Sequence, residues 1–215
     1  MKLTGRTILI TGGTSGIGFE LAKQLIEQRN TVLITGRDAQ RLAATKSKLA
    51  VHTYLCDAAN PTDIEKLQRS LAVDFPNLDT LINNAGIMRN LDLNQLHELT
   101  DVTLEVAVDL SGPIQMVQAF LPQLKARPDA LIVNVSSGLA FVPFPLSPVY
   151  SAAKAGVHAY SGACKWVEKD IGDCPARCVR NCGSTNRKAR RIGGYGQWKA
   201  LPRRAGTAHT SLIRK

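Results

Sequence analysis

The sequence contains no hydrophobic run close to the ~20 residues that are needed to cross a bilayer. Its first apolar run, residues 7–10, is also too short for the hydrophobic core of a signal peptide. We therefore expect a cytoplasmic protein that does not contact a membrane. The sequence has no internal repeat and no low-complexity segment, and its 215 residues are enough to bury a sizeable hydrophobic core.

The sequence also has no excess of charge over its first three quarters. Residues 1–163 hold 14 basic and 14 acidic side chains, whereas residues 164–215 hold 13 basic and 3 acidic ones and supply the whole net charge of +10. Four of the five cysteines lie in the same final segment. Because the basic excess is confined to one end of the chain, we do not expect nucleic acid as a partner.

Five short apolar runs, rich in β-branched residues, alternate with longer amphipathic stretches. The runs span residues 7–10, 31–35, 52–55, 80–82 and 131–135. Their nearly continuous apolar character is typical of strands buried on both faces. The helical stretches span residues 19–28, 39–49, 61–71 and 93–124, the last with an expected break near Gly112-Pro113. This alternation predicts a doubly wound α/β fold, a parallel sheet with helices on both faces.

Glycines dominate the segment that follows the first predicted strand, TGGTSGIG at residues 11–18. A helix N-terminus offers unpaired backbone N–H groups and a partial positive charge, and glycine lets the backbone approach an anion closely. The pattern is typical of a turn that binds the pyrophosphate of a dinucleotide, although an ordinary glycine-rich turn is the alternative. The expected contacts come from Gly12, Thr14, Ser15, Ile17 and Gly18.

Two residues at the ends of the next predicted strands fit other parts of a dinucleotide. Arg37 lies 19 residues after Gly18, at a position where an acidic residue suits the ribose of NAD and an arginine suits the 2′-phosphate of NADP. Asp57 follows the third predicted strand and is placed to bind the adenine amino group. The alternatives are a solvated arginine at a helix start and an aspartate that caps a helix.

The fourth predicted strand ends at the sequence NNAG, residues 83–86. Side-chain amides at this position tie adjacent loops together, and Gly86 leaves room for a cofactor at the same edge of the sheet. We therefore add Asn84, Ala85 and Gly86 to the expected cofactor site.

Ser137, Tyr150 and Lys154 predict acid–base chemistry. Tyr150 and Lys154 are four residues apart and share one face of a helix. A free tyrosine has a pKa of about 10, and a nearby ammonium is expected to stabilise the phenolate and lower that pKa. The tyrosine then gives a proton to a carbonyl oxygen as hydride arrives at the carbon, or takes it back in the reverse reaction. Ser137 is placed to hold the same oxygen by a hydrogen bond. The alternative is that Tyr150 and Lys154 are an ordinary Y-x-x-x-K pair on a surface helix.

In this order, TGxxxGxG, NNAG and S-x12-Y-x-x-x-K make the chain, from about residue 3 to residue 163, resemble a short-chain dehydrogenase/reductase with a Rossmann-type sheet. The resemblance implies Ser137, Tyr150 and Lys154 as the catalytic set, with Tyr150 and Lys154 also at the cofactor. It implies a small-molecule carbonyl or alcohol substrate, and a homodimer or homotetramer that forms through residues 105–124 and 151–167. NADP(H) is the expected cofactor because of Arg37, NAD(H) is the alternative, and no metal is expected.

One residue departs from the pattern of this family. Members commonly have an asparagine that holds a water in a proton relay with the lysine, and Asp109 occupies that position here. A carboxylate at residue 109 could pair with Lys154 instead and would alter the environment of Tyr150.

The final quarter of the chain also departs from the family pattern. The family continues with two more strands and a Pro-Gly loop, whereas this chain has no Pro-Gly and has only Cys182-Gly183 near the expected place. We therefore expect a sheet that is incomplete at its C-terminal strands, an NAD(P)-binding domain at residues 1–163 and a poorly ordered basic tail at residues 164–215. The alternatives to an altered or truncated tail are a divergent closing segment, a basic arm for nucleic acid or acidic partners, and a metal site of Cys174, Cys178 and Cys182.

The sequence as a whole favours an oxidoreductase that transfers a hydride between NADP(H) and a carbonyl or alcohol. The alternative is a catalytically impaired protein of the same fold that binds nucleotide and turns over nothing, because its C-terminus is truncated or frame-altered.

Overall fold

The computed structural model of the chain describes residues 3–170 and 177–179. It divides the chain into residues 1–184 and residues 185–215, and the whole of the second unit lies outside the described residues. Most of the predicted basic tail, including Cys174 and Cys182, lies outside them as well. The poor order of the tail and the domain boundary at residue 163 therefore stay predictions.

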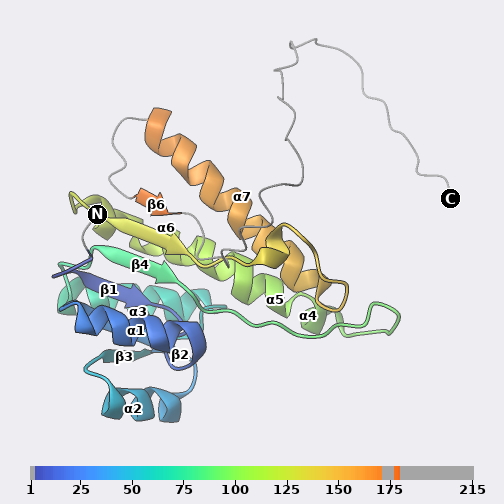
Figure 1. Cartoon of the computed structure of the whole chain (residues 1–215), viewed down its shortest axis with the longest axis horizontal. Helices are drawn as coiled ribbons and strands as arrows, with labels where there is room; N and C mark the ends of the chain where they lie inside the picture. Colours follow the sequence, from blue (N-terminus) through green and yellow to red (C-terminus); the bar gives the residue numbers. More distant parts are fainter. Residues whose placement is uncertain (1–2, 171–176, 180–215) are drawn as a thin grey trace. The chain divides into compact units, whose positions relative to one another are not determined.

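Six parallel strands form one sheet in the order β3-β2-β1-β4-β5-β6 (Figure 1). They are β1 Thr7–Ile10, β2 Thr31–Gly36, β3 His52–Leu55, β4 Thr80–Asn83, β5 Leu131–Asn134 and β6 Arg177–Val179. The chain winds outward from β1 in one direction through β2 and β3, and in the other direction through β4 and β5. The strand order reverses between β1 and β4, where ligands bind in open sheets of this kind.

Helices lie on both faces of the sheet, as the sequence predicts. They are α1 Gly16–Glu27, α2 Ala39–Lys48, α3 Pro61–Asp74, α4 Leu99–Val102, α5 Leu104–Val106, the π-helix η1 Ala107–Ser111, α6 Gly112–Lys125, the 3-10 helix η2 Gly138–Ala140 and α7 Pro148–Asp170. Leu9 of β1 packs in a cluster with side chains of α3 and α6, whereas Ile8 and Ile10 pack in a second cluster with side chains of α1 and α2. Successive β1 residues thus face opposite layers.

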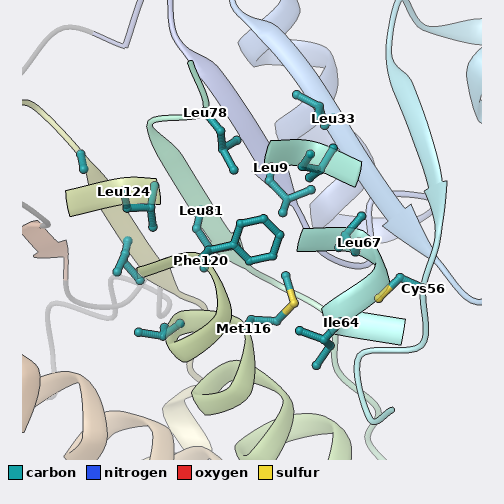
Figure 2. Packing of buried hydrophobic residues seen from close by; sticks show 14 residues of the cluster. Leu9, Leu33, Cys56, Ile64, Leu67, Leu78, Leu81, Met116, Phe120 and Leu124 are labelled. Carbon is teal, nitrogen blue, oxygen red and sulfur yellow. The ribbon is translucent and has the colours of Figure 1, made fainter. Parts of the chain in front are cut away.

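The cluster on the α3 and α6 face is built around large side chains without exposed surface. Phe120 and Met116 of α6 meet Leu81 of β4 and Leu9 of β1 (Figure 2). Both clusters hold the strand ends in fixed positions, and the loops that follow those strands build the site described below.

The expected break at Gly112-Pro113 is wrong. Residues 99–125 form α4, α5, η1 and α6 in succession, with Thr103 between the first two, and η1 runs directly into α6. Gly112-Pro113 follows directly after η1, so the change from π-helical to α-helical geometry falls at the predicted position without interrupting the helix. Gly112 allows close packing, because a Cβ there would lie 2.4 Å from the carbonyl oxygen of Ala58.

The short strand β6 adds to the five strands that the sequence predicts. It pairs with β5 in parallel register, Leu131 opposite Arg177 and Val133 opposite Val179. Its sequence has little strand character, because Val179 lies between Arg177 and Arg180. The α7 helix also continues past residue 163, to Asp170.

Candidate active site

The glycine-rich turn between β1 and α1 packs tightly against neighbouring loops. The backbone at Gly12 has φ +67°, and a Cβ there would lie 2.8 Å from the Cα of Ala85. A Cβ on Gly18 would lie 2.4 Å from both the Gly12 carbonyl oxygen and the Asn84 amide nitrogen. These two glycines therefore serve the close approach of the chain to itself, which keeps the turn open toward the sheet edge.

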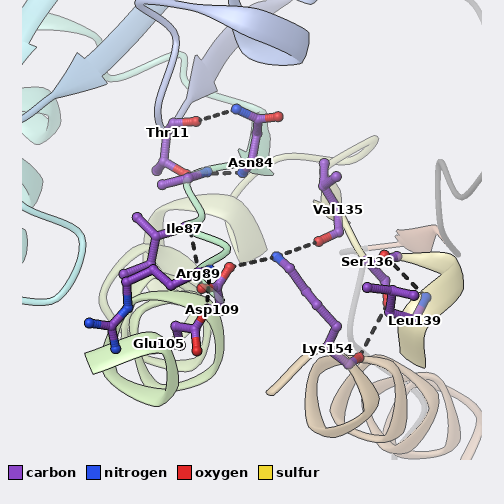
Figure 3. A network of polar contacts seen from close by, with 12 residues as sticks. Thr11, Asn84, Ile87, Arg89, Glu105, Asp109, Val135, Ser136, Leu139 and Lys154 are labelled. Carbon is purple, nitrogen blue, oxygen red and sulfur yellow. Dashed lines mark hydrogen bonds and ion pairs between the residues drawn. The ribbon is translucent and has the colours of Figure 1, made fainter. Parts of the chain in front are cut away.

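Asn84 ties the loop after β4 to this turn (Figure 3). Its side-chain amide donates to the carbonyl oxygens of Thr11 and Gly12, at 3.0 and 3.1 Å. The Thr11 hydroxyl in turn accepts from the backbone N–H groups of Asn84 and Ala85, each at 3.0 Å. These four hydrogen bonds fix the loop that carries Gly86. Asn84 therefore ties the two loops together, as expected from the sequence.

A cavity of about 600 Å³ opens at this edge of the sheet. Most of the predicted site residues line it, and they come from the ends of β1, β2, β3 and β4 and from α7: Gly12, Thr14, Ser15, Ile17, Arg37, Asp57, Asn84, Ala85, Gly86, Tyr150 and Lys154. Gly18 and Ser137 are the two predicted residues that do not line it. The structure thus brings the glycine turn and the tyrosine–lysine pair into one space.

Two charged residues at the β2 end of the cavity are absent from the sequence-based site. Asp38 and Arg41 line the cavity beside Arg37. Asp38 caps α2 by accepting from the N–H groups of Gln40 and Arg41, at 2.9 and 3.0 Å, and its other oxygen lies 3.6 Å from the Arg41 guanidinium. The signal for Arg41 is its place in the first turn of the helix predicted at residues 39–49, which begins two residues after Arg37.

Asp57 lines the cavity and also shapes its own loop. One of its carboxylate oxygens accepts from the N–H of Ala59 at 3.0 Å. The residue that caps α3 is Asn60, which accepts from the N–H of Thr62 at 3.0 Å. The alternative reading of Asp57 as the helix cap is therefore wrong.

Lys154 reaches from α7 to the opposite wall of the cavity (Figure 3). Its ammonium nitrogen lies 3.0 Å from Asp109 Oδ1 and donates to the carbonyl oxygen of Val135 at 3.2 Å. It lies 5.5 Å from the centre of the Tyr150 ring. The pairing of Lys154 with a carboxylate at residue 109, anticipated from the sequence, is confirmed.

The expected lowering of the Tyr150 pKa is wrong. Burial raises the pKa of Tyr150, the carboxylates of Asp109 and Glu105 raise it further, and only a hydrogen bond with Ser137 opposes them. The prediction of a lower Tyr150 pKa depends on the ammonium of Lys154. Asp109 compensates its charge at 3.0 Å, and a compensated charge stabilises a phenolate far less.

Gly86 makes room for protein atoms rather than only for a ligand. A Cβ on Gly86 would lie 2.5 Å from Asp109 Oδ1 and 3.4 Å from the Lys154 ammonium. The next residue, Ile87, donates its backbone N–H to Asp109 Oδ2 at 3.2 Å. The glycine of NNAG thus admits the carboxylate of Asp109 to this place.

The described residues contain neither a candidate metal site nor a candidate membrane span. Among residues 3–170 and 177–179, no group of three or more His, Cys, Asp or Glu side chains is placed to hold a metal ion. No helix in that part of the chain has the length and apolar character of a membrane span.

Comparisons with known proteins agree on one family. The family model described as short chain dehydrogenase matches residues 6–167. An uncharacterized oxidoreductase, DltE of Bacillus subtilis, is 44% identical over 163 residues, which are 75% of this chain and 65% of that protein. The NADP-dependent 3-hydroxy acid dehydrogenase YdfG of Escherichia coli K12 is 32% identical over 158 residues, 72% of this chain and 63% of that protein.

A solved structure has the same fold. The short chain dehydrogenase/reductase of Burkholderia phymatum, in complex with NAD, superposes with a TM-score of 0.76 at 22% identity, over 83% of this chain and 65% of that one. The chain therefore spans slightly less than two thirds of the length of the relatives it matches.

Proposed function

Because the chain belongs to the short chain dehydrogenase family, we propose that it transfers a hydride between NADP(H) and a carbonyl or alcohol substrate, with Tyr150 as the general acid and base. One observation carries this proposal: Tyr150 and Lys154 line the same cavity as the glycine turn after β1. The names of the relatives, an oxidoreductase and an NADP-dependent dehydrogenase, point to the same class of reaction.

The cavity fits a dinucleotide. The N-terminus of α1 opens into it, and the Ser15 side chain does not cap that helix, so backbone N–H groups are open to an anion. Gly16, with φ +55°, has nothing within 4 Å of the place of a Cβ. We therefore assign the pyrophosphate to the turn from Gly12 to Gly18, and the adenosine to the end lined by Arg37 and Asp57.

The proposed chemistry uses few groups of the chain. When bound, the nicotinamide supplies or accepts the hydride. Tyr150 gives its hydroxyl proton to the carbonyl oxygen, and Ser137, which is hydrogen-bonded to Tyr150, holds the same oxygen. Lys154 places its ammonium group at this end of the cavity, where it donates a hydrogen bond to the carbonyl oxygen of Val135.

Exposed apolar side chains follow Ser137 in the chain and precede Tyr150. Phe141, Val142 and Leu146 are 57%, 72% and 54% exposed. The backbone N–H of Leu91 bonds to the carbonyl oxygen of Leu146 at 2.9 Å, so this segment is held against the loop after β4. None of these three side chains lines the cavity, and the Phe141 ring packs against His158 with 4.6 Å between the ring centroids, so they do not define the substrate.

The preference for NADP(H) rests on two guanidinium groups. Arg37 and Arg41 both line the β2 end of the cavity, and Asp38, the acidic residue between them, is engaged as the cap of α2. Arginine recognises phosphate by charge-assisted hydrogen bonds. The NADP-dependent relative supports this preference, whereas the solved structure of the Burkholderia protein holds NAD.

Replacement of Arg37 by alanine is expected to weaken NADPH binding about tenfold and to leave NADH binding unchanged, because one phosphate-binding charge is lost. Arg41→Ala should act in the same direction. Fluorescence titration of both nucleotides measures the effect. Lys46→Ala is the matched control, because Lys46 is an exposed cation of α2 that does not line the cavity. Equal losses for NADH and NADPH would contradict the role of Arg37.

The catalytically impaired nucleotide-binding protein is the second candidate. The buried Asp109–Lys154 pair and the raised pKa of Tyr150 favour it. Titration of the full chain with NADPH, followed by a panel of aldehydes and ketones read at 340 nm, separates the two. Turnover supports the oxidoreductase, binding without turnover supports the second candidate, and no binding contradicts both. A homodimer or homotetramer remains part of the proposal.

A further inference from the structure

A buried ion pair occupies the catalytic end of the cavity. The side chains of Lys154 and Asp109 are 5% and 0% exposed, and their charged atoms are 3.0 Å apart. The second oxygen of Asp109 accepts from the N–H of Ile87. Both charges are therefore held at fixed positions by protein atoms. Lys154 lines the cavity together with Tyr150, whereas Asp109 does not line it.

The backbone aims the carboxylate at this place. Asp109 lies in the π-helix η1, which places residues 107–111 on a wider turn than an α-helix would. Gly86 lies opposite, and a Cβ there would collide with Asp109 Oδ1 at 2.5 Å. Two features, an unusual helix and a glycine, thus converge on the contact between Asp109 and Lys154 (Figure 3).

A second carboxyl lies close to the pair. Glu105 is fully buried, and its Oε1 accepts from the backbone N–H of Arg89 at 2.7 Å. Its Oε2 has no hydrogen-bond partner among the described residues. The Arg89 guanidinium pairs with Asp101 instead. The charged groups that face Tyr150 are therefore Lys154 of its own helix, Asp109 of η1 and Glu105 of α5, with more negative than positive charge.

We propose that Asp109 is a positioning residue which, by pairing with Lys154, keeps Tyr150 protonated and thereby favours carbonyl reduction over alcohol oxidation at neutral pH. The direction of the reaction follows from the proposed function and rests on it. The arrangement of Asp109, Lys154 and Tyr150 is independent of the proposed function, because it is given by the structure. The raised pKa of Tyr150, with Asp109 and Glu105 among its causes, agrees with the geometry.

The two directions make opposite demands on Tyr150. In reduction, a C–H bond forms at the carbonyl carbon with hydride from the nicotinamide, which is oxidised. The O–H bond of Tyr150 breaks as its proton passes to the carbonyl oxygen, and the tyrosine is reprotonated from solvent. In oxidation, the phenolate must exist first to take the proton of the alcohol. A carboxylate that offsets the charge of Lys154 therefore moves oxidation to alkaline pH.

The test is a titration of tyrosine ionisation in the full chain, which needs neither cofactor nor turnover. NMR of tyrosine labelled at Cζ follows the four tyrosines separately, and Tyr150→Phe assigns the signal of Tyr150. In Asp109→Asn, the ammonium of Lys154 is no longer compensated, and the pKa of Tyr150 should fall by about 1 to 2. The pH limb of alcohol oxidation should move to lower pH by the same amount.

A second tyrosine–carboxylate pair provides the control. The hydroxyl of Tyr54 donates to Asp74 at 3.2 Å, and burial together with Asp74 raises the pKa of Tyr54 to about 12. Asp74→Asn should lower the pKa of Tyr54 and leave that of Tyr150 in place. It shows that the titration detects the loss of one carboxylate and that the effect is local.

The outcomes are separable. If Tyr150 titrates in Asp109→Asn as in the wild type, or if the wild-type Tyr150 already ionises below pH 8, the proposal is overturned. Should Asp109→Asn not fold, as judged by thermal unfolding, Glu105→Gln removes the other carboxyl and must also lower the pKa of Tyr150. A wild-type chain without turnover contradicts the proposed function, and the titration still decides the role of Asp109.

Discussion

Tyr150→Phe is expected to lower kcat by a factor of about 10²–10⁴, which is the usual contribution of a positioned general acid. The phenylalanine keeps the ring and its packing and removes only the hydroxyl that gives the proton. The dissociation constant of NADPH should be nearly unchanged, since the proposed contacts to the pyrophosphate and the 2′-phosphate come from the glycine turn and the arginines that line the β2 end of the cavity. Steady-state oxidation of NADPH and a fluorescence titration measure the two quantities.

Tyr54→Phe is the matched control for this variant. Its hydroxyl bonds to Asp74, away from the cavity residues, so its loss should leave kcat within about twofold. If Tyr150→Phe keeps wild-type kcat, Tyr150 is not the acid. Turnover that persists in this variant would have to use another proton donor.

Lys154→Met is expected to destabilise the fold by about 3–5 kcal/mol at neutral pH, because it leaves the carboxylate of Asp109 buried without its partner. Burial already raises the pKa of Asp109 above its ordinary value, and the loss of Lys154 raises it further. Below the ordinary pKa the carboxyl is protonated in both states and costs nothing. The loss of stability in Lys154→Met therefore grows as the pH rises from the ordinary pKa of an aspartate toward the raised pKa of Asp109 in the folded variant. Urea denaturation at pH 5 and pH 7.5 measures it.

The double variant Lys154→Met/Asp109→Asn separates charge from packing. It removes both charges, so it should recover most of the stability that Lys154→Met loses. A double variant no more stable than Lys154→Met would show that the lost contacts of the lysine stem, rather than the unpaired carboxylate, cause the deficit. Wild-type stability in Lys154→Met would contradict the buried ion pair itself.

The strands and the glycine turn are predictable because local sequence determines them. Residues 7–10 and 52–55 are apolar runs between turn residues, and the structure has β1 and β3 at these bounds. Strand β1 is buried on both faces, which favours a continuous apolar run. Strand β3 lies at the edge of the sheet with Leu55 64% exposed, so the expectation that it is buried on both faces is wrong. Gly12 and Gly18 sit where any side chain would collide with the neighbouring loop, and such positions mark the turn in the sequence.

The features that the sequence analysis misses depend on tertiary contacts. The sequence of β6 has little strand propensity, and the strand forms through its backbone pairing with β5. The helix does not break at Gly112-Pro113, because the wider π-helical turn η1 continues directly into α6 there. The pKa of Tyr150 has the opposite direction to the prediction. Spacing along a helix reveals Lys154, and the family pattern points to Asp109, but neither reveals the burial of the phenol or the nearby Glu105.

Deuterium transfer follows the proposed hydride itself. The full 215-residue chain is incubated with the panel of aldehydes and ketones and with NADPH that carries deuterium at both positions of C4, so that transfer from either face is detected. Mass spectrometry then locates the label in the product. We predict that deuterium appears on the former carbonyl carbon with the wild-type chain, and at least about 100-fold more slowly with Tyr150→Phe. Bound NADPH that transfers no deuterium to any carbonyl would contradict hydride transfer at this cavity.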